Sequence, residues 1–470
     1  MTRRSFLKYS GTGIFSLSMG LSRATGQEKR IPNILIIVAD DLGWNAVGYH
    51  NEAVKTPNID ERICRQGIEL DQFYVSPMCS PTRCGLMTGR YPIRYGCARA
   101  VMPPWRDHGL PTDELMMSEL LAQAGYEHRG VFGKWHMGHS RKRYLPLRRG
   151  FTRFYGHYNG ALDYYTHERE GELDWHDDWD ACRDEGYGTE LIATKAADFV
   201  REHADEPFFC YVPFSAPHSP FQAPKKYLDM YADIEDEKKR TYYAMITCMD
   251  DGIGKILDVL DSAGIADHTL VWFFSDNGGV GSIHGNNDPL HGSKLTSFEG
   301  GVRVVSCARY SDWMTGVKVS VSTAFVDLLP TVAALVGLDP EKAGAKPLDG
   351  MDLNPILKGQ PAQMDRTLFF YHGQSGPENE QCSIIKYPWK LVANGPDLRK
   401  GVGDRDLLLY DLSNDPNETE NVAAAHPKEV KSLLEECISF RTLQPDHAIP
   451  PFHVGREGFE APKDWVIEDE

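Results

Sequence analysis

The chain has 470 residues, of which 41% are hydrophobic and 25% charged. This composition is typical of a folded globular protein, and it excludes a disordered, collagenous or coiled-coil chain. The net charge of −17 disfavours nucleic-acid binding, because phosphate neutralisation needs a basic surface. The ten cysteines are too few for a disulfide scaffold, and no apolar run approaches the roughly 18 residues that a membrane span needs.

The first 26 residues predict an export signal. Arg3 and Arg4 precede a mildly apolar stretch rich in Gly and Ser, which ends in small residues before Gln27. The pattern resembles the bacterial twin-arginine signal, whose cargo is exported already folded. It implies the twin-arginine export machinery as a partner and a periplasmic or extracellular location. The alternative is a disordered basic tail, and disulfide pairing stays open because a chain folded before export need not form any.

From Pro32 onward, short apolar runs alternate with helical patterns, which is the rhythm of parallel βαβ units. The apolar runs are residues 33–38, 130–132, 208–214 and 269–275. The helical patterns are residues 58–67, 114–124, 189–202, 239–263 and 327–336, the last followed by Gly337 as a C-cap. We therefore predict an α/β fold with a large, mostly parallel sheet flanked by helices.

An aromatic and charged insertion interrupts this rhythm between residues 150 and 188. Its aromatic residues are Phe151, Phe154, Tyr155, Tyr158, Tyr164, Tyr165, Trp175 and Trp179. Linkers are poor in aromatic residues, so we interpret the insertion as a long functional loop region. The alternative is that these side chains pack inside the protein.

After residue 360 the pattern changes to short apolar runs at 367–371, 382–385, 389–392 and 406–410, followed by a helical pattern at 426–440. These runs predict a small antiparallel sheet with one helix. We therefore expect a catalytic domain over residues 31–365 and a small C-terminal α+β subdomain with a tail over residues 366–470.

Residues capable of chemistry follow each of the long apolar runs directly. They are Asp40 and Asp41, Lys134 and His136, His218, and Asp276 and Asn277. Because ligands bind beyond the carboxyl ends of the strands in open α/β sheets, four strands would direct these groups to one rim. Each residue alone has an ordinary structural explanation, such as a turn or a hydrogen-bonded packing residue. Their coincidence favours a functional site.

Three carboxylates and one amide offer only oxygen ligands. Such ligands suit Ca²⁺ or Mg²⁺ rather than Zn²⁺, which prefers His and Cys. Irregular cages with bidentate carboxylates favour Ca²⁺ of the two. Lys134 and Lys294 are separate basic groups that suit an anionic substrate. A cation, lysines and histidines together predict hydrolysis of a phosphoryl or sulfuryl ester.

A Cys-x-Pro-x-Arg motif occupies residues 79–83 and opens another predicted helix. Ser80 is a candidate helix cap, Pro81 fits the first turn, and Arg83 lies one turn after Cys79. We expect a thiol at the positive end of a helix beside a guanidinium to be acidified. The alternative is a structural cysteine. A cysteine phosphatase would need arginine six positions after the cysteine, where this chain has Gly85.

This motif, with the Thr-Gly-Arg of residues 88–90, resembles the sulfatase signature of the alkaline-phosphatase superfamily. The resemblance covers nearly the whole chain after Pro32. It is carried by residues 39–43 (ADDLG), 56–60 (TPNID), 133–138 (GKWHMG), 216–218 (APH), 275–279 (SDNGG), Lys294, 299–303 (EGGVR), 409–412 (LYDL) and 414–416 (NDP). The resemblance implies an alkaline-phosphatase-like fold and a sulfuric ester hydrolase.

The resemblance further implies that a maturation enzyme oxidises Cys79 to Cα-formylglycine, whose hydrate is the nucleophile. The implied ligands of one Ca²⁺ ion are Asp40, Asp41, Asp276, Asn277 and the residue derived from Cys79. Arg83 would stabilise the hydrate. Lys134, Lys294 and His218 would bind sulfate oxygens, and His136 and His218 would transfer protons.

Two further segments, residues 145–151 (LPLRRGF) and 163–168 (DYYTHE), resemble the arylsulfatase B type, the N-acetylgalactosamine 4-sulfatases. This implies a sulfated carbohydrate substrate of the chondroitin or dermatan type, or a related glycan. The aromatic insertion would offer flat faces to sugar rings.

Two alternatives remain at this point. A formylglycine-dependent phosphonate or phosphodiester hydrolase shares the Cys-x-Pro-x-Arg motif, but such relatives tend to carry His where this chain has Asn277. An inactive, unmatured glycan-binding relative would keep an intact thiol at Cys79 and would bind without turnover.

Overall fold

The computed structural model of the chain describes residues 31–360, 365–400 and 407–468. The predicted export signal, residues 1–26, lies outside the described residues. The described residues from Pro32 onward form one compact unit. Within the described part of the chain, no helix is long and apolar enough to cross a membrane.

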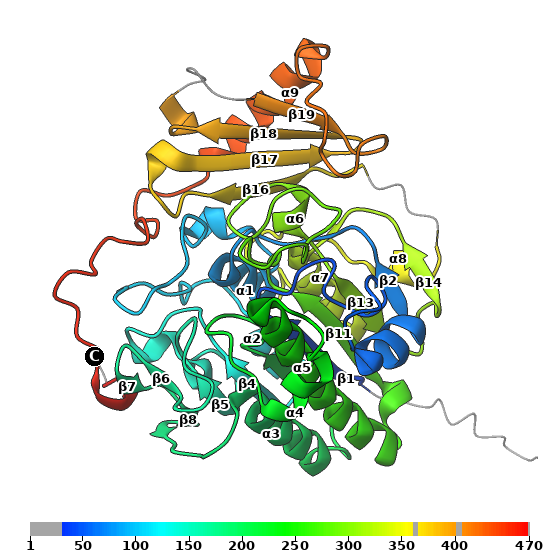
Figure 1. Cartoon of the computed structure of the whole chain (residues 1–470), viewed down its shortest axis with the longest axis vertical. Coiled ribbons are helices and arrows are strands. Elements are labelled where there is room, and N and C mark those ends of the chain that lie inside the picture. Colours follow the sequence, from blue (N-terminus) through cyan, green and yellow to red (C-terminus); the bar gives the residue numbers. More distant parts are fainter. Residues whose placement is uncertain (1–30, 361–364, 401–406, 469–470) are drawn as a thin grey trace, which may run out of the picture. The chain divides into compact units, whose positions relative to one another are not determined.

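A ten-stranded mixed sheet lies at the centre of this unit (Figure 1). Its strands, in spatial order, are β14 (Val317–Val319), β2 (Ile68–Leu70), β13 (Ser306–Arg309), β11 (Thr269–Ser275), β1 (Asn33–Ala39), β10 (Phe208–Pro213), β4 (His128–Lys134), β5 (Arg153–His157), β8 (His176–Asp177) and β9 (Asp180–Ala181). The five strands from β11 to β5 are parallel. The predicted mostly parallel sheet is therefore confirmed.

Helices cover both faces of the sheet. Helices α1, α2 and α7 lie on one face, and α3 and α5 lie on the other. The α-helices of the described residues are α1 (Cys79–Thr88), α2 (Met117–Gln123), α3 (Gly188–Glu202), α4 (Lys225–Leu228), α5 (Glu237–Ser262), α6 (Glu299–Val302), α7 (Leu328–Val336), α8 (Asn354–Leu357) and α9 (Pro427–Arg441). Ile34 and Ile36 of β1 belong to the core that contains α1, α2 and α7, whereas Leu35 and Ile37 belong to the core that contains α3 and α5. Alternate side chains of one strand are thus buried on opposite faces, which explains its unbroken apolar run.

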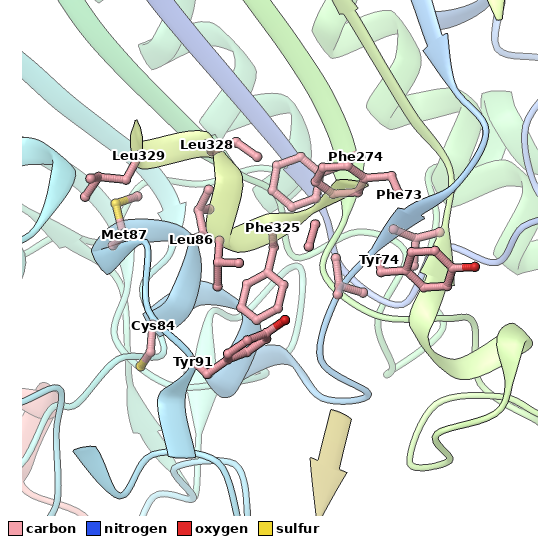
Figure 2. Close-up of a cluster of buried hydrophobic side chains, with 14 of the residues drawn as sticks. Phe73, Tyr74, Cys84, Leu86, Met87, Tyr91, Phe274, Phe325, Leu328 and Leu329 are labelled. Carbon is pink, nitrogen blue, oxygen red and sulfur yellow. The ribbon is translucent and has the colours of Figure 1, made fainter. Parts of the chain in front are cut away.

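The core on the α1 side fixes the helix that carries the Cys-x-Pro-x-Arg motif. Figure 2 shows Leu86 and Met87 of α1 among Phe325, Leu328 and Leu329, and all five side chains are buried. The helix ends at Gly89, which has a left-handed φ of 67°. Apolar packing therefore holds the carboxyl half of α1, while its amino-terminal residue points to the rim of the sheet described below.

Helix α1 does not begin as the sequence predicts. Its first residue is Cys79 and its cap residue is Met78, which makes no side-chain cap hydrogen bond. The Oγ of Ser80 instead accepts a hydrogen bond from the backbone N–H of Met102 (3.1 Å). The expected capping role of Ser80 is wrong, because tertiary contact with the following loop uses its hydroxyl.

The aromatic insertion is largely structured. It contributes β5, β8 and β9 to the main sheet, and β6 (Glu168–Arg169) and β7 (Glu172–Leu173) form a separate hairpin. The buried aromatic residues are Phe151, Phe154, Tyr155, Tyr158, Tyr164 and Trp175. Only Tyr165 and Trp179 of the eight are exposed, at 46% and 39%. The interpretation as a loop offering aromatic faces is corrected: most of these rings stabilise the fold.

The C-terminal region contains the predicted small antiparallel sheet. Its strands are β16 (Leu368–His372), β17 (Glu380–Lys386), β18 (Trp389–Gly395) and β19 (Leu407–Asp411), and α9 packs against it. Three short strands, β12 (Arg303–Val304), β3 (Phe73–Tyr74) and β15 (Thr323–Ala324), form a further sheet. The buried Nζ of Lys390 on β18 lies 2.8 Å from carboxylates of Glu299 and Glu418, which ties the small sheet to α6.

Candidate active site

The carboxyl ends of the central strands bring the predicted residues together. Ala39 pairs with Ser275 in the parallel register of β1 and β11, so Asp40 and Asp276 leave the sheet side by side. The backbone N–H of Asp276 donates to the carbonyl of Ala39 (3.0 Å). Lys134 is the last residue of β4, because this strand extends beyond the predicted 130–132. Each of these polar residues is fully buried.

Arg83 on α1 bridges this cluster. Its Nε and Nη2 donate to Oδ2 of Asp276 (2.9 and 2.7 Å), and its Nη1 donates to the carbonyl of Lys134 (2.9 Å). Burial alone would lower the pKa of Arg83, but the carboxylates of Asp276 and Asp40 raise it above its ordinary value. The guanidinium therefore stays charged and orients Asp276.

Cys79 lies beside the same carboxylates. Its Sγ and one carboxylate oxygen each from Asp40 and Asp276 all lie within 4.8 Å of one another. Burial raises the pKa of the Cys79 thiol, and the two carboxylates add to this rise, while Lys134 and Lys294 oppose it. The expectation of an acidified thiol is therefore wrong, because desolvation of the buried thiolate outweighs the helix terminus and the two lysines.

Three oxygen atoms in this centre lack partners. Oδ1 of Asp40, Oδ2 of Asp41 and Oδ1 of Asn277 are buried and have no hydrogen-bond partner among the described residues. A buried acceptor without a partner is costly. A hard cation would satisfy all three oxygens, and carboxylate and amide oxygens are the ligands such ions prefer. The donor set therefore fits the implied calcium ion.

The centre also contains charged groups of both signs in close contact. Burial, followed by the repulsion of Asp40, raises the pKa of Asp276 to about 6. Nζ of Lys134 contacts Oδ2 of Asp40, and Nζ of Lys294 lies 2.5 Å from Oδ1 of Asp41. Lys294 lines the pocket described below, where it could bind an anionic group, whereas Lys134 is fully buried beside Asp40.

The two predicted histidines lie at the mouth of this centre. His136 has a left-handed φ of 57°, and its Nε2 lies 3.1 Å from the carbonyl of Met102. Nε2 must therefore carry the hydrogen, so Nδ1, which has no partner among the described residues, is the free acceptor. Nε2 of His218 lies 3.6 Å from Oδ2 of Asp41, and burial lowers the pKa of His218 to about 3.

Two residues that support the site, Tyr242 and Gly160, are not among those predicted from the sequence. Asp41 adopts a left-handed φ of 66°, and the hydroxyl of Tyr242 holds this turn by donating to the carbonyl of Asp41 (2.9 Å) and accepting from Gly43 (3.0 Å). Gly160 lies against the ring of His136, where a Cβ atom would come within 2.4 Å. Neither residue stands near the site in sequence, so no local pattern could have identified it.

A pocket of about 510 Å³ opens above the centre. Its polar lining residues are Asp41, Cys79, His136, Arg169, His218, Ser219, Lys294 and Gln374. A larger cavity of about 810 Å³, lined by residues that include Trp105, Arg141 and Trp465, shares Pro104 with this pocket. The larger cavity contains none of the predicted site residues.

The chain is similar to several known proteins in sequence and in fold. The sulfatase family model matches residues 32–338. Arylsulfatase J of Mus musculus is 37% identical, over 89% of this chain and 77% of that protein. N-acetylgalactosamine-6-sulfatase of Homo sapiens is 34% identical, over 82% of this chain and 80% of that protein. The crystal structure of Ps i-CgsB, solved alone and in complex with k-i-k-neocarrahexaose, is 29% identical with a TM-score of 0.80, over 88% of this chain and 94% of that one.

Proposed function

The chain belongs to the sulfatase family and is a sulfuric ester hydrolase, and from this premise we propose that it removes sulfate from sulfated carbohydrates with a formylglycine derived from Cys79 and one Ca²⁺ ion. The observation that carries this proposal is the buried centre itself. Cys79 and Asp41 line one pocket, and carboxylate oxygens of Asp40 and of Asp276, the partner of Arg83, lie within 4.8 Å of the Cys79 Sγ. Buried oxygens of Asp40, Asp41 and Asn277 have no hydrogen-bond partner among the described residues.

The proposed reaction uses two groups, formylglycine and Ca²⁺, together with side chains of the protein. The formylglycine hydrate would supply the oxygen nucleophile, and Ca²⁺, held by Asp40, Asp41, Asp276, Asn277 and residue 79, would stabilise negative charge on the sulfuryl group. Lys134 and Lys294 bind the sulfuryl oxygens, which places sulfur beside residue 79. Arg83 holds Asp276 in position to accept the proton of the attacking hydroxyl.

The remaining proton transfers belong to groups at the mouth of the centre. The leaving sugar oxygen needs a proton, which Lys294 supplies, or His218 once the charge of the bound sulfate has raised its pKa. The Nδ1 of His136, which has no hydrogen-bond partner among the described residues, would accept the proton of the second hydroxyl of the hydrate, and this would allow sulfate to leave and the aldehyde to be restored. An ordinary serine or cysteine could not regenerate itself by that elimination.

The relatives support a carbohydrate as the substrate. One relative is named for N-acetylgalactosamine, and a solved relative holds a neocarrahexaose. The pocket, at about 510 Å³, has the size of sites that enclose small organic ligands, which span roughly 300–1,000 Å³. We therefore keep the substrate class at sulfated carbohydrate, with an N-acetylgalactosamine sulfate of the chondroitin or dermatan type as one candidate.

Maturation and export belong to the same proposal. Cys79 is only 2% exposed, so an oxidising maturation enzyme would need to reach it before the chain folds. The twin-arginine route, which exports folded cargo, would then carry the matured enzyme to the periplasm or the exterior.

Two measurements test this function together. Mass spectrometry of the peptide that contains residues 79–83 from exported protein should show the aldehyde, and defined sulfated oligosaccharides should release sulfate. An unmodified Cys79 together with glycan binding but no turnover would instead identify an inactive, glycan-binding relative. Release of phosphate or phosphonate esters in preference to sulfate would identify the phosphonate hydrolase alternative.

Removal of divalent cations should destabilise the protein. A cation bound only by the folded state stabilises it by roughly 2.7 kcal/mol at one hundred times its Kd, so chelation should lower Tm by about 2–5 °C. Added Ca²⁺ should restore the value better than Mg²⁺. Differential scanning calorimetry of the apo and reloaded protein measures the effect, and a Tm unaffected by chelation and by Ca²⁺ would contradict a cation at these oxygens.

Replacement of His218 by alanine should lower kcat by roughly 10²- to 10³-fold, because a positioned proton donor or acceptor contributes about that factor. Steady-state sulfate release from a sulfated sugar measures the change, since a sugar oxygen needs the proton in order to leave. His284→Ala, which alters an exposed histidine, is the matched control and should keep the original rate. A near-normal kcat for His218→Ala would remove His218 from the reaction.

A further inference from the structure

One cationic side chain that lines the pocket has no role in the proposed hydrolysis of the sulfate ester. Arg169 lies on β6 and lines the same pocket as Cys79, His136 and Lys294. The other cations of the centre are bound to its carboxylates: Arg83 to Asp276, Lys134 to Asp40 and Lys294 to Asp41. No ion pair joins Arg169 to these carboxylates within the described part of the chain.

The surroundings of Arg169 leave its charge poorly balanced. Its Nε is buried without a hydrogen-bond partner among the described residues. Its Nη2 lies 3.4 Å from Glu170, a loose ion pair between side chains that are 28% and 31% exposed. Burial lowers the pKa of Arg169 below its ordinary value, although Glu170 and Asp174 oppose this shift and Arg456, of the same charge, adds to it. A partly desolvated guanidinium in this state has capacity for a further anion.

The buried carboxylate of Asp174 acts on Arg169 through its charge but makes no ion pair with it among the described residues. Asp174 accepts hydrogen bonds from the backbone N–H groups of Tyr158 and Asn159 (each 2.9 Å) and from the side-chain amide of Asn159 (2.9 Å). These donors hold Asp174 in place, so its carboxylate is committed elsewhere.

The backbone fixes Arg169 at its place in the pocket wall. Arg169 pairs with Glu172 in the β6–β7 hairpin (Figure 1). The two connecting residues, Glu170 and Gly171, have φ values of 52° and 83°, as a tight two-residue hairpin turn requires. Nε1 of Trp465 also donates to the carbonyl of Arg169 (3.0 Å). The guanidinium is therefore presented from a defined position rather than from a free loop.

We propose that Arg169 binds a second anionic group of the substrate, a carboxylate or a second sulfate ester on the glycan that carries the scissile sulfate. A guanidinium binds either group through two parallel hydrogen bonds. The enzyme then selects a glycan that bears at least two anionic groups. This inference rests on the proposed sulfatase function and narrows its substrate class.

Three matched disaccharide sulfates test the proposal. The first carries a uronic acid carboxylate, the second carries its methyl ester, and the third carries a second sulfate ester on an otherwise neutral neighbour. The wild type should hydrolyse the first or the third with a kcat/KM well above that of the methyl ester. A preference for the first identifies the carboxylate as the recognised group, and a preference for the third identifies the sulfate. Equal rates for all three would overturn the proposal.

Variants of Arg169 show whether this residue causes the preference for a second anionic group. Arg169→Met should raise KM for the preferred dianionic substrate by roughly 10- to 100-fold, with kcat and the methyl ester kinetics nearly unchanged. The KM of Arg169→Lys should fall between those of the wild type and Arg169→Met, because lysine keeps the positive charge but lacks the planar guanidinium. Glu170→Gln should retain the preference. Arg183→Met, which alters an exposed arginine of the same insertion paired with Asp464, is the matched control.

A binding measurement separates this proposal from the proposed function. The desulfated disaccharides, as acid and as methyl ester, are titrated calorimetrically into the wild type and Arg169→Met. We expect the wild type to bind the recognised anionic form at least 10-fold more tightly than the ester, and the variant to lose this difference, even if no sulfate ester is turned over. Equal effects of Arg169→Met on both forms, or no effect on either, would contradict an anion site at Arg169.

Discussion

Replacement of Cys79 by alanine is expected to abolish sulfate release, with kcat lowered by about 10⁴-fold or more. Nucleophile replacements in hydrolases cost up to about 10⁶-fold, because the remaining groups cannot supply a covalent route. The site gives no substitute: the alanine methyl group would face Asp40 and Asp276, which are held by Lys134 and Arg83. Sulfate release from an aryl sulfate, followed to the detection limit, measures the loss.

The control for this prediction is Cys182→Ser, which changes a half-buried cysteine outside the site and should keep full activity. Thermal unfolding of Cys79→Ala should stay near the wild-type Tm, since only one small side chain is removed. Substantial sulfate release by a stable Cys79→Ala protein would refute residue 79 as the nucleophile, whatever its state of oxidation.

Replacement of Arg83 by methionine is expected to lower the free energy of unfolding by about 3–5 kcal/mol. Removal of one partner of a buried ion pair leaves an uncompensated charge, and this costs more than the pair contributes. Here Asp276 would lose both hydrogen bonds from Arg83, and the fully buried carboxylate of Asp40 would lose a cation 3.8 Å away. Urea unfolding measures the change.

The same substitution should lower kcat by about 10³-fold at temperatures where the protein remains folded, because Asp276 loses its orientation. Arg201→Met provides the control, since this arginine is 60% exposed and pairs with Asp198 on the surface of α3. Such exposed pairs contribute about 0–1 kcal/mol. An Arg83→Met protein as stable as Arg201→Met would show that the buried network does not depend on the guanidinium.

Much of the architecture follows from the order of residues along the chain. The apolar runs at 33–38, 208–214 and 269–275 became the central strands β1, β10 and β11, since strands covered on both faces carry no alternation. Four polar clusters followed four such runs, and parallel strands end at one edge, so the site could be located before any distance was known.

Sequence reasoning failed where one residue had two local explanations. Ser80 has the chemistry of a helix cap, yet its hydroxyl accepts from Met102. The aromatic residues of the insertion have the chemistry of a sugar platform, yet Tyr155 and Trp175 are buried. In both cases the role of the side chain depends on groups from distant parts of the chain that lie against it. A local sequence pattern does not contain that information.

The sequence by itself determined the fold class, the sulfatase family and the residues at the strand ends, because periodicity, strand-end position and the Cys-x-Pro-x-Arg motif are properties of neighbouring residues. Only the tertiary structure decided how those residues meet. Among the described residues, it left oxygens of Asp40, Asp41 and Asn277 without hydrogen-bond partners, raised the pKa of the Cys79 thiol, and brought Arg169 into the pocket. Desolvation and charge proximity cause these effects, and both depend on distances between segments that are far apart in the chain.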